Sequence, residues 1–328
     1  MSEAPTPILE LVRVRKEFAL QGSLAARMLG LARRVIALDD VSLAIREGEV
    51  LGLVGESGSG KSTLAHAIVR LTNLTSGAIR YRGQDITRLR SADLGGLRGR
   101  IQLVFQDSHS SLNPRKNVAQ ALQDPLRLCG VPAPARRNRA AELLSRVGLD
   151  AAFLDRYPHE LSGGQRQRVG IARALAMSPD LLIADEPVSS LDVSLQAQIL
   201  NLLIDLRRQL GLTIIFISHD LAVVNNISTR VGVMYAGRIV EIGEPAEVLK
   251  APAHPYTAAL LASIPAGLDG RARGRPPVLG EPPDPAHLPP GCRFVTRCPR
   301  AMAVCRDEYP RTTLLSQTHE AECHLLAS

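Results

Sequence analysis

The sequence predicts an α/β fold in which a glycine-rich loop joins a buried strand to a helix. Glu49 to Val54 is a short apolar run that leads into this loop, and Ser62 to Leu71 has the pattern of the helix after it. Two later apolar runs, Leu181 to Ala184 and Thr213 to Ile217, are typical of strands buried in a parallel sheet. A helix is predicted between them, over Ile199 to Leu210, and this alternation of strands and helices indicates an α/β core.

The N-terminal part predicts more exposed strands. Apolar and polar residues alternate over Ile8 to Val14 and over Val41 to Ile45, which suits strands at the start of a sheet. Between them, Ala19 to Val35 is basic, and we expect an inserted solvated loop there. The alternative is a basic amphipathic helix that touches lipid headgroups. Further along, Arg136 to Val147 predicts a helix with an Arg-rich and an Ala/Leu face.

The composition changes near the C-terminus. Pro, Gly and Arg dominate the stretch from Pro265 to Pro290, which is typical of a linker, and four of the five cysteines follow it. We therefore expect a domain boundary near Lys250, with residues 1–250 as one domain and 251–328 as an extension. A chain of 328 residues is long enough for both. A single copy of the glycine-rich loop argues against two fused copies of one domain.

The overall composition excludes some classes of function. Trp is absent and aromatic residues make up only 3%, so an aromatic platform for single-stranded nucleic acid is not expected. The net charge of +7 fits either an anionic partner or a solvated arginine-rich surface. No apolar run reaches the roughly 18 residues that span a bilayer, and Met1 to Pro7 lacks the features of a secretory signal. We expect a cytoplasmic protein, with any membrane-spanning parts supplied by other chains.

The glycine-rich loop has the composition of a phosphate-binding loop. Its candidate binding residues are Gly55, Ser57, Gly58, Gly60, Lys61, Ser62 and Thr63. Glycines allow several backbone N–H groups to converge on a phosphate, and the following helix adds its positive N-terminus. Lys61 would supply a cation to the β- and γ-phosphates and Ser62 a hydroxyl to Mg²⁺. The alternative, a glycine-rich turn with a chance Lys-Ser pair, is disfavoured by the strand before it and the helix after it.

An acidic pair follows a later strand. Asp185 ends the apolar run that begins at Leu181, and Glu186 comes directly after it. An Asp at this position can reach Mg²⁺ beside Ser62, directly or through water. A Glu one residue on points elsewhere and could polarise the attacking water as a general base. Such a pair is ordinarily a solvated turn, but the phosphate loop earlier in the chain favours the catalytic interpretation.

Together with two further motifs, these residues resemble the ATP-binding cassette (ABC) ATPases. One motif is the signature Leu161-Ser162-Gly163-Gly164-Gln165, which other phosphate-loop proteins lack, and the other is a lone His219 after an apolar strand. The resemblance covers Ile8 to Ile264. It implies a P-loop NTPase nucleotide-binding domain with a RecA-like core, an antiparallel β subdomain and a helical signature subdomain over about 108–175. It also implies binding and hydrolysis of ATP with Mg²⁺.

The resemblance assigns roles to individual residues. Phe18 resembles the aromatic residue that stacks on adenine, and Gln106 the glutamine that senses Mg²⁺ and the attacking water. Ser162, Gly163, Gly164 and Gln165 resemble the element that caps the γ-phosphate bound by the opposite subunit. Ser190-Leu191-Asp192 resembles the loop that couples the two sites, and His219 the switch histidine at the γ-phosphate. Because no motif residue is replaced, the resemblance implies a hydrolysis-competent ATPase.

Several stretches resemble one branch of this family, the ATPases of bacterial oligopeptide and dipeptide importers, which also serve nickel. They are Ser111-Leu112-Asn113-Pro114-Arg115, Tyr157-Pro158-His159-Glu160, the run from Glu186 to Ser194, and the run from His254 to Leu261. The chain looks like the second of the two ATPase subunits in that branch. The resemblance implies a second, paralogous ATPase, two transmembrane permeases, a substrate-binding protein and no nucleic acid. It implies a peripheral place on the cytoplasmic face of the inner membrane, held through the permeases.

The cysteines of the extension form a spaced group. Cys292, Cys298, Cys305 and Cys323 are separated by 5, 6 and 17 residues. A reducing cytoplasm disfavours disulfides, and four thiolates suit Zn²⁺ or an iron–sulfur cluster. The zinc interpretation is weakened, but not excluded, because the usual Cys-x2-Cys pair is missing. Resemblance to the tails of peptide-importer ATPases points to a [4Fe-4S] cluster, and four free buried thiols are the alternative. Cys129 lies outside the group and is expected to be a packing residue.

Three other functions are disfavoured, and a fourth stays open. A soluble cassette acting on the ribosome or on DNA would be expected to carry two cassettes or a long coiled-coil insert, and neither is present. A non-catalytic regulatory cassette is disfavoured by Asp185, Glu186 and His219, and an exporter subunit by the tail. An importer ATPase for nickel or another small solute stays open, because cargo selection belongs to other subunits.

Overall fold

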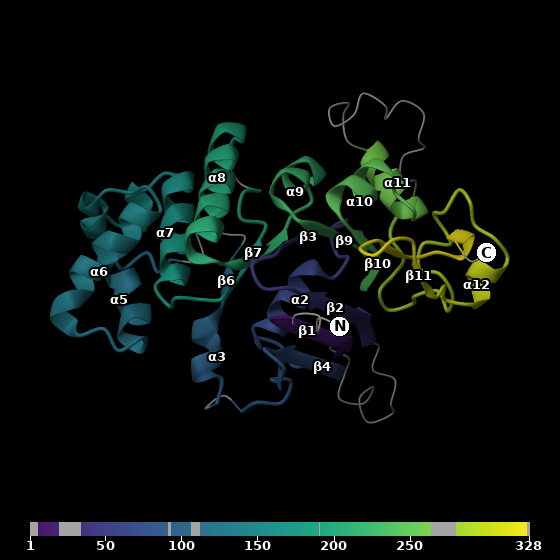
Figure 1. Cartoon of the computed structure of the whole chain (residues 1–328), viewed down its shortest axis with the longest axis horizontal. Coiled ribbons are helices and arrows are strands. Elements are labelled where there is room, and N and C mark those ends of the chain that lie inside the picture. The colour runs from purple at the N-terminus through teal and green to yellow at the C-terminus, as the bar shows by residue number, and fades with distance from the viewer. Residues whose placement is uncertain are drawn as a thin grey trace. The chain divides into compact units, whose positions relative to one another are not determined.

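The computed structural model describes residues 6–19, 34–90, 93–105, 112–189, 191–263 and 280–326 of the chain. They form two compact units. Unit 1 comprises residues 1–46, 51–88 and 219–328, and unit 2 comprises 47–50 and 89–218. Figure 1 labels most of the helices and strands of both. The α/β content predicted from the sequence is confirmed in each unit.

Unit 1 contains two sheets. The first is antiparallel, with strand order β2-β1-β4-β5, and the second contains the order β11-β12-β10-β9-β3. The strands are β1 (Leu9–Ala19), β2 (Arg34–Ile45), β3 (Val50–Val54), β4 (Ser76–Tyr81), β5 (Gln84–Asp85), β9 (Arg230–Tyr235), β10 (Arg238–Gly243), β11 (Thr312–Leu314) and β12 (Glu320–Glu322). The helices are α2 (Lys61–Ile68), α9 (Leu221–Ile227), α10 (Pro245–Lys250), α11 (Pro255–Ala262), α12 (Val304–Asp307) and the 3-10 turn η3 (His324–Leu326).

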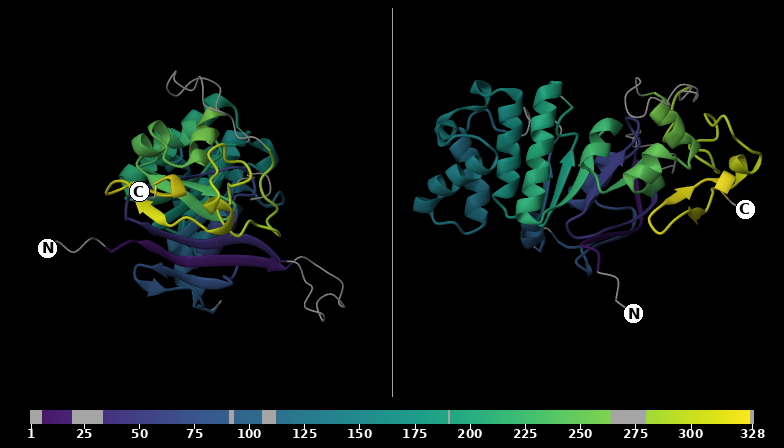
Figure 2. Two further views of the ribbon diagram at one scale, coloured as in Figure 1. Left: turned by 90° about the vertical axis from the view of Figure 1, so that its right-hand side faces the viewer. Right: turned by 45° about the horizontal axis from the view of Figure 1, so that its top comes forward.

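The antiparallel sheet of unit 1 is longer than the sequence predicts. Strand β1 pairs with β2 from Leu9 opposite Ile45 to Ala19 opposite Arg34, and with β4 on its other edge. Figure 2 shows the two long strands running side by side. Arg34 and Val35, which belong to the expected loop, are strand residues that pair with Ala19 and Phe18. Most of the basic stretch from Ala19 to Val35 lies outside the described residues.

Unit 2 contains a parallel sheet and a group of helices. Strands β6 (Ile101–Val104), β7 (Leu181–Asp185) and β8 (Thr213–Ile217) pair in parallel, with β7 in the middle. Residues of β7 and β8 are all buried, which explains why their sequences are continuously apolar. The helices are α3 (Leu94–Arg100), α5 (Val118–Leu128), α6 (Ala133–Arg146), η1 (Ala151–Asp155), η2 (Pro158–Glu160), α7 (Gly163–Leu175) and α8 (Val193–Leu210).

Helices α5, α6 and α7 pack against one another, and Figure 2 shows them together. Their shared core consists of small and aliphatic side chains such as Leu122, Leu143 and Val169, each at most 1% exposed. Because Asn117 and Ser162 both form capping boxes, the first turns of α5 and α7 are fixed by side chains of the chain itself. The three helices lie between Val118 and Leu175.

The C-terminal residues of unit 1 are fixed to its second sheet by a buried carboxylate. Glu241 in β10 is 1% exposed and accepts hydrogen bonds from the backbone N–H groups of Ala253 and His254, at 2.8 and 2.9 Å. The imidazole Nε2 of His319 lies 2.8 Å from the same carboxylate. This hydrogen bond raises the pKa of His319 above its ordinary value. A buried charge is tolerated here because three donors surround it.

This pair predicts a pH dependence of stability. The pKa of His319 is raised in the folded protein, so the pair stabilises the fold fully below about pH 6.5 and loses this contribution as the pH rises through the folded pKa. The change H319Q should keep a donor to Glu241 but remove the titration. We expect the apparent melting temperature to fall more between pH 6 and pH 8 for the wild type than for H319Q. Equal falls in the two proteins would contradict the assignment.

Candidate functional site

The glycine-rich loop and the helix after it lie in unit 1 as predicted. Strand β3 is buried along its whole length and leads into the loop, and α2 begins at Lys61. Gly60 has a φ of 107°, and a Cβ there would lie 2.6 Å from the carbonyl oxygen of Ala37. Gly55 has a φ of 152°, and a Cβ there would lie 2.2 Å from the carbonyl oxygen of Met234. Neither position has room for a side chain, so the path of the loop depends on both glycines.

Lys61 folds back over this loop. Its ammonium group donates hydrogen bonds to the carbonyl oxygens of Gly55 and Glu56, both at 2.8 Å, and to the Ser59 hydroxyl at 3.2 Å. Lys61 is only 5% exposed, whereas Ser57 and Gly58 at the crest of the loop are exposed. The loop therefore presents accessible backbone around a buried cation, which is the arrangement that a polyphosphate requires.

The acidic pair lies at the end of β7 in unit 2. Asp185 is the last residue of the strand and is 5% exposed. Glu186 has a φ of 46°, a left-handed conformation that is uncommon for a residue with a side chain. Its N–H donates to the carbonyl oxygen of Ile217 at 3.0 Å, and its own carbonyl accepts from the Ser189 hydroxyl at 3.1 Å. The backbone around Glu186 is thus held in a strained conformation by its neighbours, as occurs at functional sites.

The signature forms the first turn of α7. The Ser162 hydroxyl accepts from the Gln165 N–H at 3.3 Å, and the Gln165 side chain accepts from the Ser162 N–H at 2.9 Å. A Cβ on Gly163 would lie 3.1 Å from Leu191, and one on Gly164 would lie 3.2 Å from Leu195. The two glycines therefore allow the turn to pack closely on the start of α8. The capping box was not predicted, although a Ser followed by a Gln three residues later is its usual signal.

Comparison with known proteins places these motifs in a family. A family model described as ABC transporter matches residues 38–189, and one described as oligopeptide/dipeptide transporter, C-terminal region, matches 240–305. The chain is 48% identical over 325 residues to the oligopeptide transport ATP-binding protein AppF of Bacillus subtilis, covering 97% of each chain. It is 51% identical over 291 residues to a putative peptide import ATP-binding protein of Brucella abortus, covering 88% of this chain and 86% of that protein.

The chain belongs to the ATP-binding cassette family. Solved structures agree with this. The dimeric cassette MJ0796, in a post-hydrolysis state bound to ADP and Pi, is 31% identical with a TM-score of 0.63, covering 72% of this chain and 98% of that one. The cassette cbiO1 from Clostridium perfringens is 30% identical with a TM-score of 0.62, covering 75% and 92%. The predicted P-loop NTPase fold and the resemblance to peptide-importer ATPases are confirmed.

The other predicted residues of the cassette have the following places. Phe18 lies in β1 and is 41% exposed, with the Lys16 ammonium 4.6 Å from its ring centroid. His219 is exposed in unit 1, directly before Asp220, which caps α9. Asp192 caps α8 by accepting from the Leu195 N–H at 2.9 Å. Gln106 and Ser190 lie outside the described residues. Lys61, Ser62 and His219 thus belong to unit 1, and the acidic pair and the signature to unit 2.

The four tail cysteines lie around one small cavity in unit 1. Cys292, Cys298, Cys305 and Cys323 all line it, and its volume is about 10 Å³. Burial raises the pKa of Cys292 to about 11 and raises that of Cys298 and of Cys323. Within the described residues, no group of three or more His, Cys, Asp or Glu side chains is arranged to hold a metal ion. Cys129 is exposed and contacts Met177, so the expectation of a buried packing residue was wrong for it.

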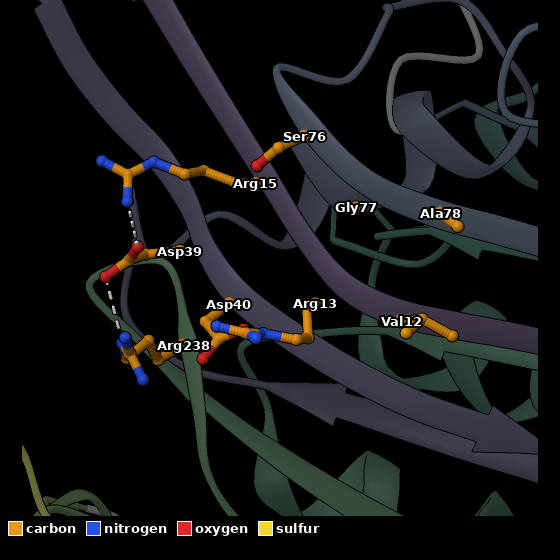
Figure 3. A pocket seen from close by; sticks show the side chains of 9 residues that line it. All are labelled: Val12, Arg13, Arg15, Asp39, Asp40, Ser76, Gly77, Ala78 and Arg238. Atoms are coloured by element: carbon orange, nitrogen blue, oxygen red, sulfur yellow. Dashed lines mark hydrogen bonds and ion pairs between the residues drawn. The ribbon is translucent and has the colours of Figure 1, made fainter.

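A larger cavity lies at the edge of the antiparallel sheet in unit 1 (Figure 3). It has a volume of about 530 Å³ and is lined by charged residues. Asp39 accepts from Arg15 at 3.2 Å and from Arg238 at 3.1 Å, and Arg13 pairs with Asp40 at 3.0 Å. Asp39 is 3% exposed, and hydrogen bonds from arginines hold its pKa below the ordinary value although burial opposes them. The three arginines of this lining are therefore engaged with its two aspartates.

No helix in the described part of the chain is both long enough and apolar enough to cross a membrane. The longest helix, α8, has polar residues throughout its length.

Proposed function

We propose that this chain is an ATP-hydrolysing subunit that energises the import of peptides through a multi-subunit ABC transporter. The observation that carries the proposal is the presence, in one chain, of a complete phosphate loop and a C-terminal region of the oligopeptide/dipeptide transporter type. The relatives named as oligopeptide transport or peptide import proteins cover nearly the same length. Import of nickel or another small solute by the same machinery is the alternative.

ATP binding would use the loop backbone and Lys61. The accessible N–H groups around Ser57, Gly58 and Gly60 would surround the β-phosphate, and the α2 N-terminus would add its positive dipole. The Lys61 ammonium now rests on loop carbonyls, and a bound γ-phosphate would draw it away because a phosphate dianion is the stronger partner. Ser62 and Thr63 would follow in the first turn of α2, with Ser62 on Mg²⁺.

Hydrolysis would depend on the acidic pair, on Gln106 and on His219. Asp185 and Gln106 would join Ser62 at Mg²⁺, and Glu186 would take a proton from the attacking water as general base. His219 would contact the γ-phosphate. The strained backbone at Glu186 supports this role, since such conformations cluster at active sites.

Transport would require a second ATPase subunit. In the proposed dimer, Ser162 to Gln165 of one subunit would cap the γ-phosphate bound by the other, using the N–H groups at the start of α7. Phe18 would stack on adenine. The partners are a paralogous ATPase, two permeases and a substrate-binding protein, at the cytoplasmic face of the inner membrane. The division into 1–250 and 251–328 then separates the cassette from the importer-specific extension.

The extension is proposed to hold a [4Fe-4S] cluster through Cys292, Cys298, Cys305 and Cys323. The support is that the four side chains gather at one cavity from separate turns of the tail. Bound to four thiolates, the cluster would serve as a structural crosslink in a segment with few apolar residues. The raised pKa of Cys292 means that this thiol is protonated without a metal, so binding would have to release its proton. Zinc and four free thiols are the alternatives.

The catalytic assignment predicts the behaviour of Glu186→Gln. The variant should bind ATP but hydrolyse it roughly 10² to 10⁴-fold more slowly, because the general base is lost. Uptake of labelled dipeptides, longer peptides and nickel would be measured in cells that lack the gene and carry either form. Glu142→Gln, which removes an exposed carboxylate on α6, is the matched control. We expect peptide uptake with wild type and E142Q only. Normal transport by E186Q would refute the role of Glu186, and rescue of nickel alone would refute peptide cargo.

The cluster proposal predicts the metal content of the protein. After anaerobic purification, the full-length chain should contain about four iron and four sulfide per molecule and absorb broadly near 400 nm. Cys298→Ser should lose the iron, whereas Cys129→Ser should keep it, because Cys129 is exposed and lies in unit 2. A colourless wild-type protein without iron would end the cluster hypothesis, and stoichiometric zinc would replace it.

A further inference from the structure

Glu56, the second residue of the phosphate loop, is bound by two residues of the C-terminal extension. The Arg297 guanidinium donates to both carboxylate oxygens, with Nη1 to Oε2 at 2.8 Å and Nη2 to Oε1 at 3.0 Å. The backbone N–H of Glu56 donates to the Tyr256 hydroxyl at 2.9 Å. The side chain and the main chain of one loop residue are therefore both held from outside the loop. All three residues lie in unit 1.

The surroundings make this contact rigid. The Arg297 side chain is 5% exposed and that of Glu56 is 23% exposed, so water competes little for the pair. Arg297 also donates to the Tyr235 hydroxyl at 3.2 Å. The rings of Tyr235, Tyr256 and Phe294 pack together with centroids 4.4 to 5.4 Å apart. A planar, bidentate guanidinium supported by packed aromatic rings has little freedom to change its position.

The opposite side of Glu56 faces the nucleotide machinery. Its carbonyl oxygen accepts from the Lys61 ammonium at 2.8 Å and from the Ser59 N–H at 3.2 Å. A shift of Glu56 would therefore displace a partner of the phosphate-binding lysine and turn the loop amides. Glu56 alone therefore connects Arg297 and Tyr256 to Lys61 and Ser59, without any intervening residue.

Arg297 is presented by the cysteine segment. The N–H of Val295 donates to the carbonyl of Cys292 at 3.1 Å, and the N–H of Arg297 to that of Phe294 at 3.0 Å. These two consecutive turns fix the place of Arg297, directly before Cys298. Tyr256 is in the first turn of α11. His254 precedes this helix and caps it, because the His254 Nδ1 accepts from the Tyr256 N–H at 3.0 Å. Two separately folded parts of the extension thus converge on Glu56.

From these contacts we infer that Arg297 and Tyr256 are positioning residues of the nucleotide site, which set the conformation of the phosphate loop through Glu56. The extension is then a component of ATP binding in addition to any role in the transporter. The inference rests on the proposed function, because it requires the loop to bind ATP.

A second ion pair of the same tail provides a matched control. Arg293 donates to Asp39 at 2.7 Å, and the two side chains are 12% and 5% exposed. This pair also fixes the tail to the cassette, but Asp39 belongs to β2 and its other partners are Arg15 and Arg238. Loss of Arg293 should therefore weaken docking of the tail without releasing Glu56. A change in ATP binding that is caused by substitution of Arg297, and not by substitution of Arg293, must therefore act through the phosphate loop.

The test compares R297Q, Y256F, E56Q and R293Q in the full-length chain within its purified transporter. The dissociation constant of ATP and the KM and kcat of hydrolysis would be measured, with the melting temperature as a check of folding. We expect R297Q to raise the dissociation constant and the KM by roughly tenfold or more, because a bidentate charged contact is lost. Y256F keeps the ring packing and should raise both severalfold. R293Q should leave them within about twofold of the wild type while lowering the melting temperature by as much as R297Q does.

A double variant decides whether Arg297 acts through Glu56. If it does, E56Q/R297Q should be no worse than R297Q alone, since contacting residues show non-additive effects. Additive losses, or ATP constants for R297Q and Y256F equal to those of R293Q, would overturn the inference. A wild-type chain that neither binds nor hydrolyses ATP would instead refute the proposed function. If R297Q fails to fold, the comparison of Y256F with R293Q gives the same decision.

Discussion

The path of the loop between β3 and α2 is the constraint on which the rest of unit 1 depends. A phosphate can be bound there only if the backbone N–H groups converge, and that path brings Gly55 and Gly60 against the carbonyls of Met234 and Ala37. These carbonyls belong to β9 and β2, which are strands of the two different sheets of unit 1. Both sheets therefore pack directly against the loop. The Gly237 N–H donates to the carbonyl oxygen of Ser59 at 2.9 Å, which adds a hydrogen bond between the loop and the turn after β9.

Buried carboxylates connect the C-terminal residues to the rest of unit 1. Glu241 accepts from backbone N–H groups at the start of α11 and from His319, Asp39 accepts from Arg293, and Glu56 accepts from Arg297. Each of these carboxylates is buried or half-buried and has several donors, which offsets the cost of removing its charge from water. A segment with few large apolar residues can be held in one place in this way. The same bonds make its position sensitive to single substitutions.

How far the sequence predicts the structure depends on how local the determining contacts are. The strand, loop and helix around Lys61 were predicted because they are consecutive and their residue types are fixed by the phosphate chemistry. The apolar strands β7 and β8 were predicted from burial on both faces. Helix ends differed by a few residues, as at α8, which begins at Val193 because Asp192 caps it. The strained φ of Glu186 has no local signal, since it is imposed by hydrogen bonds to β8.

Contacts between residues far apart in the chain could not be predicted from the sequence. Arg297 lies 241 residues from Glu56, and nothing in the spacing of the tail residues indicates that an arginine between two cysteines meets the phosphate loop. Tyr256 was noted only as part of a family-like stretch. The four cysteines were expected to lie together from their spacing and the family resemblance. Their positions around the cavity depend on turns that the sequence does not specify.

The most direct test of the account is ATP binding by the full-length chain with Gly60→Ala, compared with Gly83→Ala. Both glycines have a positive φ, at 107° and 78°, so both changes strain the backbone. A Cβ on Gly83 meets no atom within 4 Å, and this residue lies in the turn between β4 and β5. The account predicts at least a roughly tenfold loss of ATP affinity for G60A and wild-type affinity for G83A, because only G60A disturbs the phosphate-binding amides. Equal affinities in both variants would contradict the claim that this loop is the nucleotide site.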